Sequence, residues 1–486
     1  MSAQIKTDVC VIGAGSGGLS VAAGASQMGA RTVLIEKGPM GGDCLNFGCV
    51  PSKALLAAAH AAQSQRTSAA FGIAAREPEI DFARVHAHVR GVIEAIAPMD
   101  SEARFTAMGV QVLRGAARFT GPREVSVGDT RIRAKWFVVA TGSRPAAPPI
   151  EGLDTVSYLT NETVFELTER PEHLVIVGGG PIGIEMAQAF RRLGARVTVI
   201  EGARILGPGD PELVQLLRTR LSAEGVDLHE GMAVKAVRPG TGSSTDTGDG
   251  GVAVDIAPAN GDGGAAQTIS GSHLLVAAGR APNVEDLGLE AAGIEYDRKG
   301  LRVDAGLRST NRRVFAVGDV AGGPQFTHVA GYHAGIVIRR ILFRLFWAKA
   351  DLRALPAVTY TEPELAQVGL SESAARAKGP ITVLRWPFAE NDRAQAEHST
   401  DGLIKVIATP KGKILGVHML GPHAGELIQP WVLAMQNGLK IRHMAGYISP
   451  YPTLGEVGKR AAGTFYYPSL FSARTKRIVR LLMRLP

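Results

Sequence analysis

The strongest restriction on the fold of this 486-residue chain is a glycine pattern that occurs twice. Residues 13–18 and residues 178–183 both read Gly-x-Gly-x-x-Gly, each between an apolar run and a helix-forming stretch. A second apolar run then ends in an acid, Glu36 in one unit and Glu201 in the other. Such glycines let a pyrophosphate approach a helix N-terminus, and the acid can take the ribose hydroxyls. The chain is therefore predicted to hold two dinucleotides on two α/β folds.

Two of the three cysteines, Cys44 and Cys49, lie five residues apart just before a predicted helix, Ala54 to Ala62. A helix start stabilises an anion and lowers a thiol pKa, so the pattern favours a reversible disulfide. A static disulfide or a pair of zinc ligands is the alternative. Zinc needs about four ligands, and the third cysteine, Cys10, lies in an apolar strand where it is a small core residue. No metal site is expected.

The segment from Gly41 to Lys53 reads Gly-Gly-x-Cys-x4-Cys-x-Pro-Ser-Lys. It resembles the active-site motif of the FAD-dependent disulfide reductases, which include dihydrolipoamide dehydrogenase, glutathione reductase and mercuric reductase. The resemblance runs from about Asp8 to about Gly463. It implies FAD at the first glycine motif and a nicotinamide nucleotide at the second.

The resemblance implies specific roles for residues near the cysteines. Cys49 would hold the charge-transfer position under the flavin ring, and Cys44 would meet the substrate. Lys53 would pair with Glu185 beside the flavin, where the alternative for Glu185 is an ordinary helix glutamate. The residues expected at FAD are Gly13, Gly15, Gly18, Glu36, Lys37, Gly42, Lys53, Ala117, Thr141, Gly142, Asp319, Phe326, Thr327 and His328.

At the second nucleotide site, Glu201 favours a free ribose 2′-hydroxyl and repels a 2′-phosphate. We therefore expect NADH rather than NADPH, with the nearby Arg204 as the residue that would weaken this preference. The residues expected at this nucleotide are Gly178, Gly180, Pro181, Ile182, Gly183, Glu185, Glu201, Val234 and Gly279.

The expected fold class is α/β, with two dinucleotide-binding, Rossmann-like domains and a C-terminal α+β dimerisation domain. The predicted boundaries are 1–148 and 273–350 for the FAD domain, 149–272 for the NAD(P)H domain, and 351–486 for the dimerisation domain. Between the motifs we expect helical periodicity in 68–121, loops of a β-hairpin in 240–271, a long helix at 330–348 and a helix at 425–437.

One motif in the expected dimerisation domain departs from the pattern of the resembled family. Tyr451 stands where dihydrolipoamide dehydrogenase and glutathione reductase have a histidine, while the glutamate that orients it is present as Glu456. In the family this acid–base residue enters the partner subunit's active site, so a homodimer is expected. Tyrosine, with a pKa near 10, shuttles protons poorly at neutral pH. Mercuric reductase has tyrosine here, but its C-terminal cysteine pair has no counterpart after Cys49.

These residues predict an oxidoreductase that passes electrons from NADH through FAD and the Cys44–Cys49 disulfide to a disulfide, a dithiol or a soft metal ion. The alternative is a flavin enzyme that donates to a quinone or another small oxidant. A non-enzymatic structural role conflicts with two complete dinucleotide motifs.

The net charge of +8 is modest for this length, so no nucleic-acid partner is expected. The N-terminus carries no secretory signal, and a cytoplasmic location is expected. The segment after Ser472 places Ile478, Leu481, Leu482 and Leu485 on one helical stripe among basic residues. This pattern predicts either a helix packed on its own dimer, a frayed end, or weak peripheral contact with a membrane.

Overall fold

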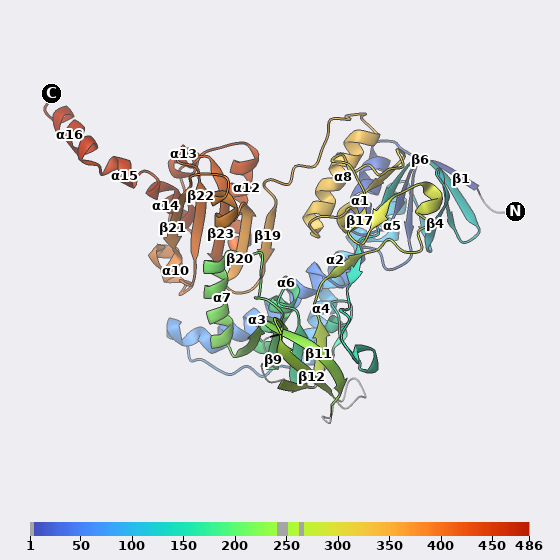
Figure 1. The fold of residues 1–486 in the computed structure, drawn as a ribbon, viewed down its shortest axis with the longest axis horizontal. Coiled ribbons are helices and arrows are strands. Elements are labelled where there is room, and N and C mark those ends of the chain that lie inside the picture. The colour runs from blue at the N-terminus through green and yellow to red at the C-terminus, as the bar shows by residue number, and fades with distance from the viewer. Residues whose placement is uncertain (1–3, 241–250, 262–266, 486) are drawn as a thin grey trace.

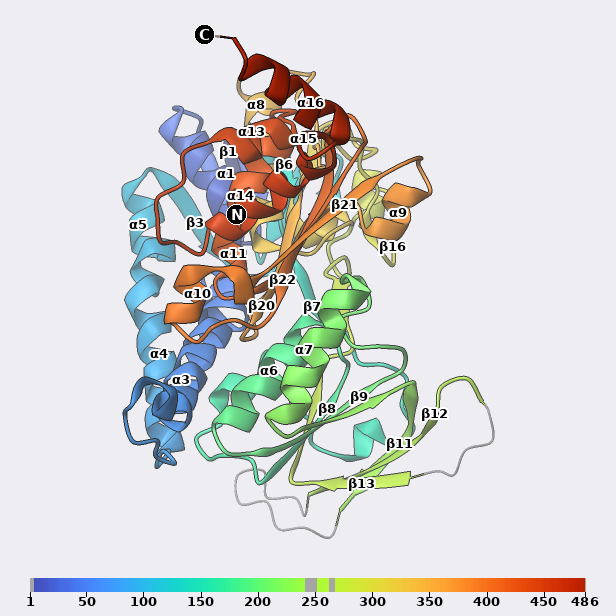
Figure 2. The same cartoon turned by 90° about the vertical axis from the view of Figure 1, so that its left-hand side faces the viewer.

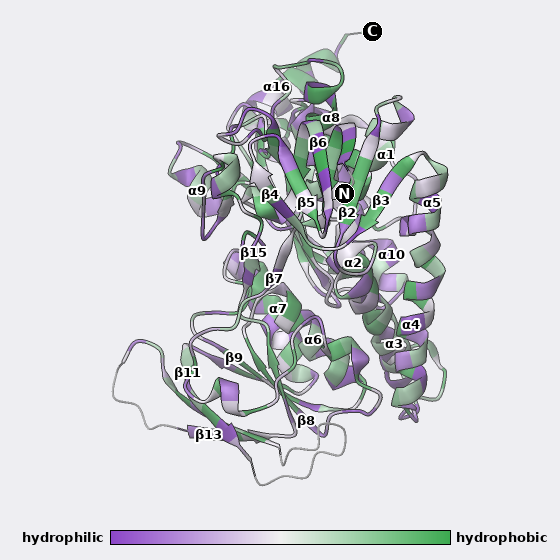
Figure 3. Cartoon of the chain, turned by 90° about the vertical axis from the view of Figure 1, so that its right-hand side faces the viewer, coloured by the Kyte–Doolittle hydropathy of each residue, from purple (hydrophilic) through white to green (hydrophobic). Residues whose placement is uncertain are grey.

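The computed structural model describes residues 4–240, 251–261 and 267–485. Its N-terminal unit is a seven-stranded sheet with strand order β3-β2-β1-β6-β5-β4 and with β18 beside β6. The strands are β1 Gln4–Ile12, β2 Thr32–Glu36, β3 Val110–Arg114, β4 Ala117–Gly121, β5 Glu124–Val127, β6 Thr130–Val139 and β18 Val314–Ala316. β1, β2, β3, β6 and β18 run parallel. Their inner residues are apolar and buried. Figure 3 colours much of these strands as hydrophobic.

Helices pack around this sheet and extend below it. They are α1 Ser16–Gln27, α2 Gly42–Asn46, α3 Cys49–Thr67, α4 Phe82–Ile96, α5 Glu102–Ala107 and α8 Thr327–Ile341. α1 and α8 pack together. α3 and α4 reach down toward the second unit, where Figure 2 shows them beside α6.

The second unit, at the bottom of Figure 1, is a parallel sheet with strand order β10-β9-β8-β14 and an antiparallel sheet β11-β12-β13. The strands are β8 His173–Val177, β9 Arg196–Glu201, β10 Val226–Glu230, β11 Met232–Pro239, β12 Val252–Pro258, β13 Gln267–Gly271 and β14 His273–Val276; the helices are α6 Pro181–Arg192 and α7 Pro211–Ala223. The expected loops at 240–271 contain β12 and β13, while 241–250 and 262–266 lie outside the described residues.

The chain leaves the first unit along β7 Ser143–Pro145 and returns along β15 Arg280–Pro282. These two short strands pair antiparallel. The two crossings between the units are therefore tied together by main-chain hydrogen bonds.

The C-terminal unit is a five-stranded antiparallel sheet with strand order β19-β20-β23-β22-β21. Its strands are β19 Pro356–Thr359, β20 Glu364–Gly369, β21 Thr382–Pro387, β22 Leu403–Ala408 and β23 Ile414–Gly421; its helices are α9 Glu372–Arg376, α10 Asp392–Ala396, α11 Ala424–Leu427, α12 Gln429–Gln436, α13 Ile441–Gly446 and α14 Glu456–Thr464. A separate core around Phe388 and Trp431 holds them together. These units confirm the expected fold class.

Three local expectations were wrong or incomplete. The helix expected at 330–348 ends at Ile341, because the buried Arg340 donates to the carbonyls of Phe346 and Ala348 and turns the chain back. The stretch 68–121 is helical only in part, since β3 and β4 lie in it. The helix expected at 425–437 is divided into α11 and α12.

The chain ends in two helices beyond the C-terminal unit, α15 Tyr467–Leu470 and α16 Ala473–Leu482. α16 projects from the body at the upper left of Figure 1. Within the described residues, the helices are all too short or too polar to cross a membrane.

Candidate active site

A cavity of about 980 Å³ lies where the three units meet. It opens at the carboxyl ends of β1 and β6, the edge at which ligands bind in parallel α/β sheets. The first glycine turn, the cysteine pair, the start of α6 and residues of the C-terminal unit all line it. Its volume is at the upper end of the range for cofactor and ligand sites.

The first glycine turn is shaped by close backbone contacts. Gly13 has φ +104°, and a Cβ there would lie 2.4 Å from the carbonyl oxygen of Ala140. A Cβ at Gly18 would lie 1.8 Å from the oxygen of Gly13, so only glycine lets α1 pack this close to β1. No side chain caps the N-terminus of α1. Its free N–H groups are available to an anion.

Glu36, at the end of β2, is fixed by two backbone donors. Its Oε2 accepts from the N–H of Ala14, and its Oε1 accepts from Gly38 at 2.6 Å. A carboxylate has about four acceptor positions, so ribose hydroxyls can still bind.

Most residues expected at FAD line the cavity, and Gly18 is the exception because it packs under the turn. Asp319 lies in the cavity wall, where burial raises its carboxyl pKa and Ser143 donates to its Oδ2. The uncapped helix, the glycine wall and this carboxyl group fit the pyrophosphate and polyol parts of FAD. The cavity residues among those expected are Gly13, Gly15, Glu36, Lys37, Gly42, Lys53, Ala117, Thr141, Gly142, Asp319, Phe326, Thr327 and His328.

Cys44 lies in α2 and Cys49 is the first residue of α3, and both are free thiols in the cavity wall. A hydrogen bond from Cys44 lowers the pKa of Cys49 to about 6, opposed by burial and aided by Thr327 and the charge of Lys53. The same contact with Cys49, together with burial, raises the pKa of Cys44. The Cys49 sulfur lies 3.4 Å from Thr327 Oγ1. The pair thus holds one thiolate and one thiol near neutral pH.

Lys53, on the first turns of α3, reaches the second unit. Its Nζ lies 2.7 Å from Glu185 Oε2, and it also lies 4.4 Å from the ring centre of Tyr360. Glu185 is buried on α6, and its Oε1 accepts from the N–H of Tyr360 at 2.9 Å. The ion pair and the two contacts of Tyr360 therefore join all three units at the cavity wall. Nothing in the sequence pattern pointed to Tyr360, which follows β19.

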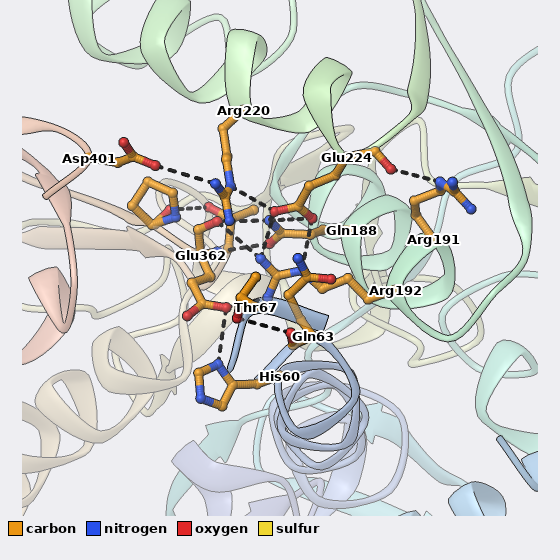
Figure 4. Close-up of polar contacts among 12 residues, drawn as sticks. His60, Gln63, Thr67, Gln188, Arg191, Arg192, Arg220, Glu224, Glu362 and Asp401 are labelled. Atoms are coloured by element: carbon orange, nitrogen blue, oxygen red, sulfur yellow. Dashed lines mark hydrogen bonds and ion pairs between the residues drawn. The ribbon is translucent and has the colours of Figure 1, made fainter. Parts of the chain in front are cut away.

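A polar network holds the face of α6 that carries Glu185 (Figure 4). Gln188 exchanges hydrogen bonds of 2.8 Å with the backbone N–H and C=O of Glu362. The buried Arg192 pairs with both Glu224 and Glu362, and His60 of α3 lies 3.0 Å from Glu362. The polar spacing 185, 188 and 192 along one helix face was the only sequence signal for this network.

The second glycine turn has the same local geometry as the first. Gly178 has φ +112°, and a Cβ there would lie 2.5 Å from the Ala277 oxygen; a Cβ at Gly183 would lie 2.0 Å from the Gly178 oxygen. α6 has no side-chain cap, and Glu201 accepts from the N–H groups of Gly179 and Ala203. This motif can therefore bind an anion in the same way.

Only part of the expected nicotinamide-nucleotide site lies in the cavity. Its members there are Pro181, Ile182 and Glu185, whereas Gly178, Gly180, Gly183, Glu201, Val234 and Gly279 lie outside it. Arg204 donates to the carbonyl oxygens of Gly207 and Gly209 at 2.6 and 2.9 Å. Its guanidinium is therefore already engaged within its own loop.

Tyr451 and Glu456 do not line the cavity of this chain. Tyr451 is 68% exposed, and its hydroxyl donates to Asp392 at 2.9 Å, which raises the pKa of the tyrosine. Glu456 begins α14. The residue that orients Tyr451 here is thus Asp392, which no motif in the sequence marks.

No group of three or more histidine, cysteine, aspartate or glutamate side chains is placed to hold a metal ion in the part of the chain that the structure describes.

Comparison with known proteins agrees with this geometry. Residues 7–334 match the family described as pyridine nucleotide-disulphide oxidoreductase, and residues 355–462 match its dimerisation domain. The chain is 38% identical over 479 residues to a mercuric reductase of Streptomyces lividans, covering 96% of this chain and 97% of the relative. It is 37% identical to dihydrolipoyl dehydrogenase 3 of Pseudomonas aeruginosa, covering 94% and 97%.

A solved structure with the same architecture is the Cu(II) complex of the HOCl-induced flavoprotein disulfide reductase RclA from Escherichia coli. The TM-score is 0.83 at 28% identity, over 94% of this chain and 99% of that one. The dimerisation domain implies a homodimer. The chain belongs to the pyridine nucleotide-disulphide oxidoreductase family, whose members use FAD and NAD(P)H, and it is a flavoprotein disulfide reductase of the lipoamide dehydrogenase and mercuric reductase class.

Proposed function

We propose that this enzyme passes electrons from NADH, through FAD and the Cys44–Cys49 pair, to a disulfide or a soft metal ion. The observation that carries the proposal is the position of both sulfurs in the wall of the 980 Å³ cavity, beside Lys53 and the first glycine turn. FAD, when bound, supplies two-electron transfer between the nicotinamide and the sulfur pair. The domain boundaries and the cofactor contacts expected from the sequence are part of this proposal.

The two sulfurs have different tasks. Two electrons and two protons convert the Cys44–Cys49 disulfide to the dithiol. Cys49, with its lowered pKa, is the thiolate held in place by Thr327 and Lys53. Cys44 is the sulfur that attacks a disulfide substrate or binds a soft metal ion, and its proton passes to the Cys49 thiolate that accepts its hydrogen bond, so that Cys44 reacts as the thiolate. Lys53 and Glu185 would set the charge beside the flavin ring.

The environment of Tyr451 bears on the substrate class. A tyrosine hydroxyl is protonated at neutral pH, and the contact with Asp392 raises its pKa further, so it is a poor base for a dithiol substrate. Reduction of a soft metal ion needs thiolates but no such base. This favours a metal ion over dihydrolipoamide, in line with the name of the Streptomyces relative and with the Cu(II) complex of the E. coli reductase.

The test is an anaerobic screen of NADH oxidation against lipoamide, glutathione disulfide, Hg(II), Cu(II) and quinones. With Cys44→Ser or Cys49→Ser, turnover of the thiol-dependent acceptor should fall at least about 100-fold. Cys49→Ser should abolish the long-wavelength absorbance of a thiolate beside the flavin, while Cys44→Ser keeps it. If the double variant keeps full activity, and only with quinones, the alternative of a quinone-directed flavin enzyme replaces the proposal.

Tyr451→His separates acid–base power from pocket shape. If the proton shuttle is the only missing part, the variant should gain about 100-fold in dihydrolipoamide oxidation. The control is Tyr451→Phe, which removes the hydroxyl without adding a base. No gain in the histidine variant would show that the pocket itself excludes that substrate.

A further inference from the structure

The C-terminal helix α16 is folded but has no buried face in its own chain. Ser472 accepts from the N–H of Thr475 and caps the helix, yet no residue of α16 is buried in the chain. Leu481 is 64% exposed, and Ile478 and Leu482 are about half exposed. Leu485, which was expected on the same helical stripe, lies beyond the end of α16 and is also 64% exposed. The matched dimerisation domain ends at residue 462, so this helix lies beyond it. An apolar stripe of this kind needs a partner surface.

The charge of the segment after Ser472 indicates which kind of surface would bind it. Glu456 is the last acid of the chain, and five basic side chains follow Ser472. None of the five makes an ion pair within the described residues. They are Arg474, Lys476, Arg477, Arg480 and Arg484. An apolar stripe with a purely basic polar face matches the interface of an anionic bilayer.

A second segment of the same character lies at the end of α8. Phe343 and Phe346 are more than half exposed, and Trp347 is 73% exposed. The buried Arg340 holds this turn through its bonds to Phe346 and Ala348. Arg344 adds an exposed cation. Aromatic residues of this kind are enriched at the headgroup level of membranes.

Figures 1, 2 and 3 share one vertical axis, and in each the C-terminal end of α8 and helix α16 lie at the upper end of the molecule. Two separate basic and apolar segments therefore lie at one end of the molecule along this axis, well apart from each other in Figure 1. The second glycine motif and its sheets lie at the opposite end.

We propose that this end of the enzyme attaches peripherally to an anionic bilayer, with α16 and the aromatic turn at 343–347 reaching the interface at two separate points. The cavity and its cysteines stay in water, so reduction continues while the enzyme is bound. Attachment is reversible and weakens with salt, because charge supplies much of it.

The test is co-sedimentation of the FAD-loaded enzyme with vesicles of phosphatidylcholine alone or with one-quarter phosphatidylglycerol, at low and high salt. The wild type should bind only the anionic vesicles. Changing the five basic residues of the tail to glutamine should lower the partition coefficient by roughly three orders of magnitude, since each of the five cations near the surface contributes about fivefold. Leu481→Ser with Leu482→Ser should also lower it, with all charges kept. Trp347→Ser should lower it by a smaller factor.

The matched control removes five exposed cations elsewhere: Arg76, Arg84, Lys235, Arg298 and Lys378, each changed to glutamine. This variant should bind like the wild type. Equal binding by the tail variant and the wild type would overturn the proposal. The proposal would also be overturned if a chain ending at Ser472 sedimented as a monomer, because the tail would then be part of the dimer interface. Wild-type binding to a DNA fragment but not to anionic vesicles would overturn it in favour of a nucleic acid.

Discussion

The two glycine-turn units share one local geometry but have different surroundings. In both, a left-handed glycine lies against a carbonyl oxygen, an uncapped helix follows, and a glutamate accepts two backbone N–H groups. The first turn faces the 980 Å³ cavity. The second contributes only Pro181, Ile182 and Glu185 to that cavity, while its acid Glu201 lies outside.

The difference indicates how one motif serves two kinds of ligand. The turn and the helix N-terminus supply anion binding wherever they occur. Walls from all three units around the first turn suit a cofactor that stays bound. Most of the second turn lies outside this cavity, which suits a nucleotide that must enter and leave in each cycle. Lys53 and Glu185 are the direct link between the two.

Among the differences between the two turns, the largest effect is expected from adding one methyl group at the third glycine of each. Gly18→Ala places a Cβ where the Gly13 oxygen lies at 1.8 Å, so the turn must move and FAD content should fall at least about tenfold. Gly183→Ala makes the equivalent clash at 2.0 Å but should leave FAD content nearly unchanged and raise the KM for NADH about tenfold. Flavin absorbance per chain and NADH kinetics measure both. Equal loss of FAD in the two variants would contradict the assignment of one nucleotide to each turn.

The link between the units should give the next largest effect. Lys53→Met leaves the buried Glu185 with only the Tyr360 N–H and should destabilise the protein by about 2 kcal/mol, since the lysine itself keeps 36% exposure. Flavin reduction by NADH should slow as well. In thermal unfolding, the double variant Lys53→Met with Glu185→Leu should be more stable than Lys53→Met alone. Simple additivity would mean that the pair is not coupled.

The two glutamates allow a smaller and more specific test. Glu201→Ser removes the charge that opposes a 2′-phosphate, so the ratio of kcat/KM for NADH over NADPH should fall about tenfold. Glu201→Gln removes the charge but keeps an oxygen that can accept from the Gly179 N–H. This variant therefore separates the effect of the charge on a 2′-phosphate from the support that the side chain gives to the loop. A wild type that prefers NADPH would show instead that Arg204 leaves the Gly207 and Gly209 carbonyls to bind the phosphate.

The smallest expected effect concerns the thiolate, which only the first unit has. The long-wavelength band of the reduced enzyme should disappear as the pH falls through about 6, the pKa of Cys49. Because this pKa lies below the ordinary thiol value of 9.0, the native dithiol binds fewer protons than the unfolded chain between these values. The stabilisation that comes from Cys49 is therefore fully present at pH 9 and is lost as the pH falls to about 6. Thr327→Val should raise the midpoint of the band by less than about one pH unit, and an unchanged midpoint would exclude a role for the Thr327 hydroxyl.

Features that depend on residues close together in the sequence were predicted well. Both turns, Glu36 and Glu201 at their strand ends, and the cysteines around the start of α3 depend on residues within about 25 positions of each other. The end of α8 was missed because Arg340 stops the helix by reaching forward to Phe346 and Ala348, and an arginine in a helical stretch gives no sign of such a bond.

The sequence by itself determined that this chain builds two anion-binding turns and a redox cysteine pair, since glycine conformation, helix starts and thiol spacing are set by neighbouring residues. Only the tertiary structure decided which turn is enclosed, that Lys53 meets Glu185 and Tyr360 across three units, that Asp392 rather than Glu456 holds Tyr451, and that α16 has no support from its own chain. These contacts join residues 59 to 175 positions apart. Burial and charge at such contacts depend on how the units pack, which no local pattern specifies.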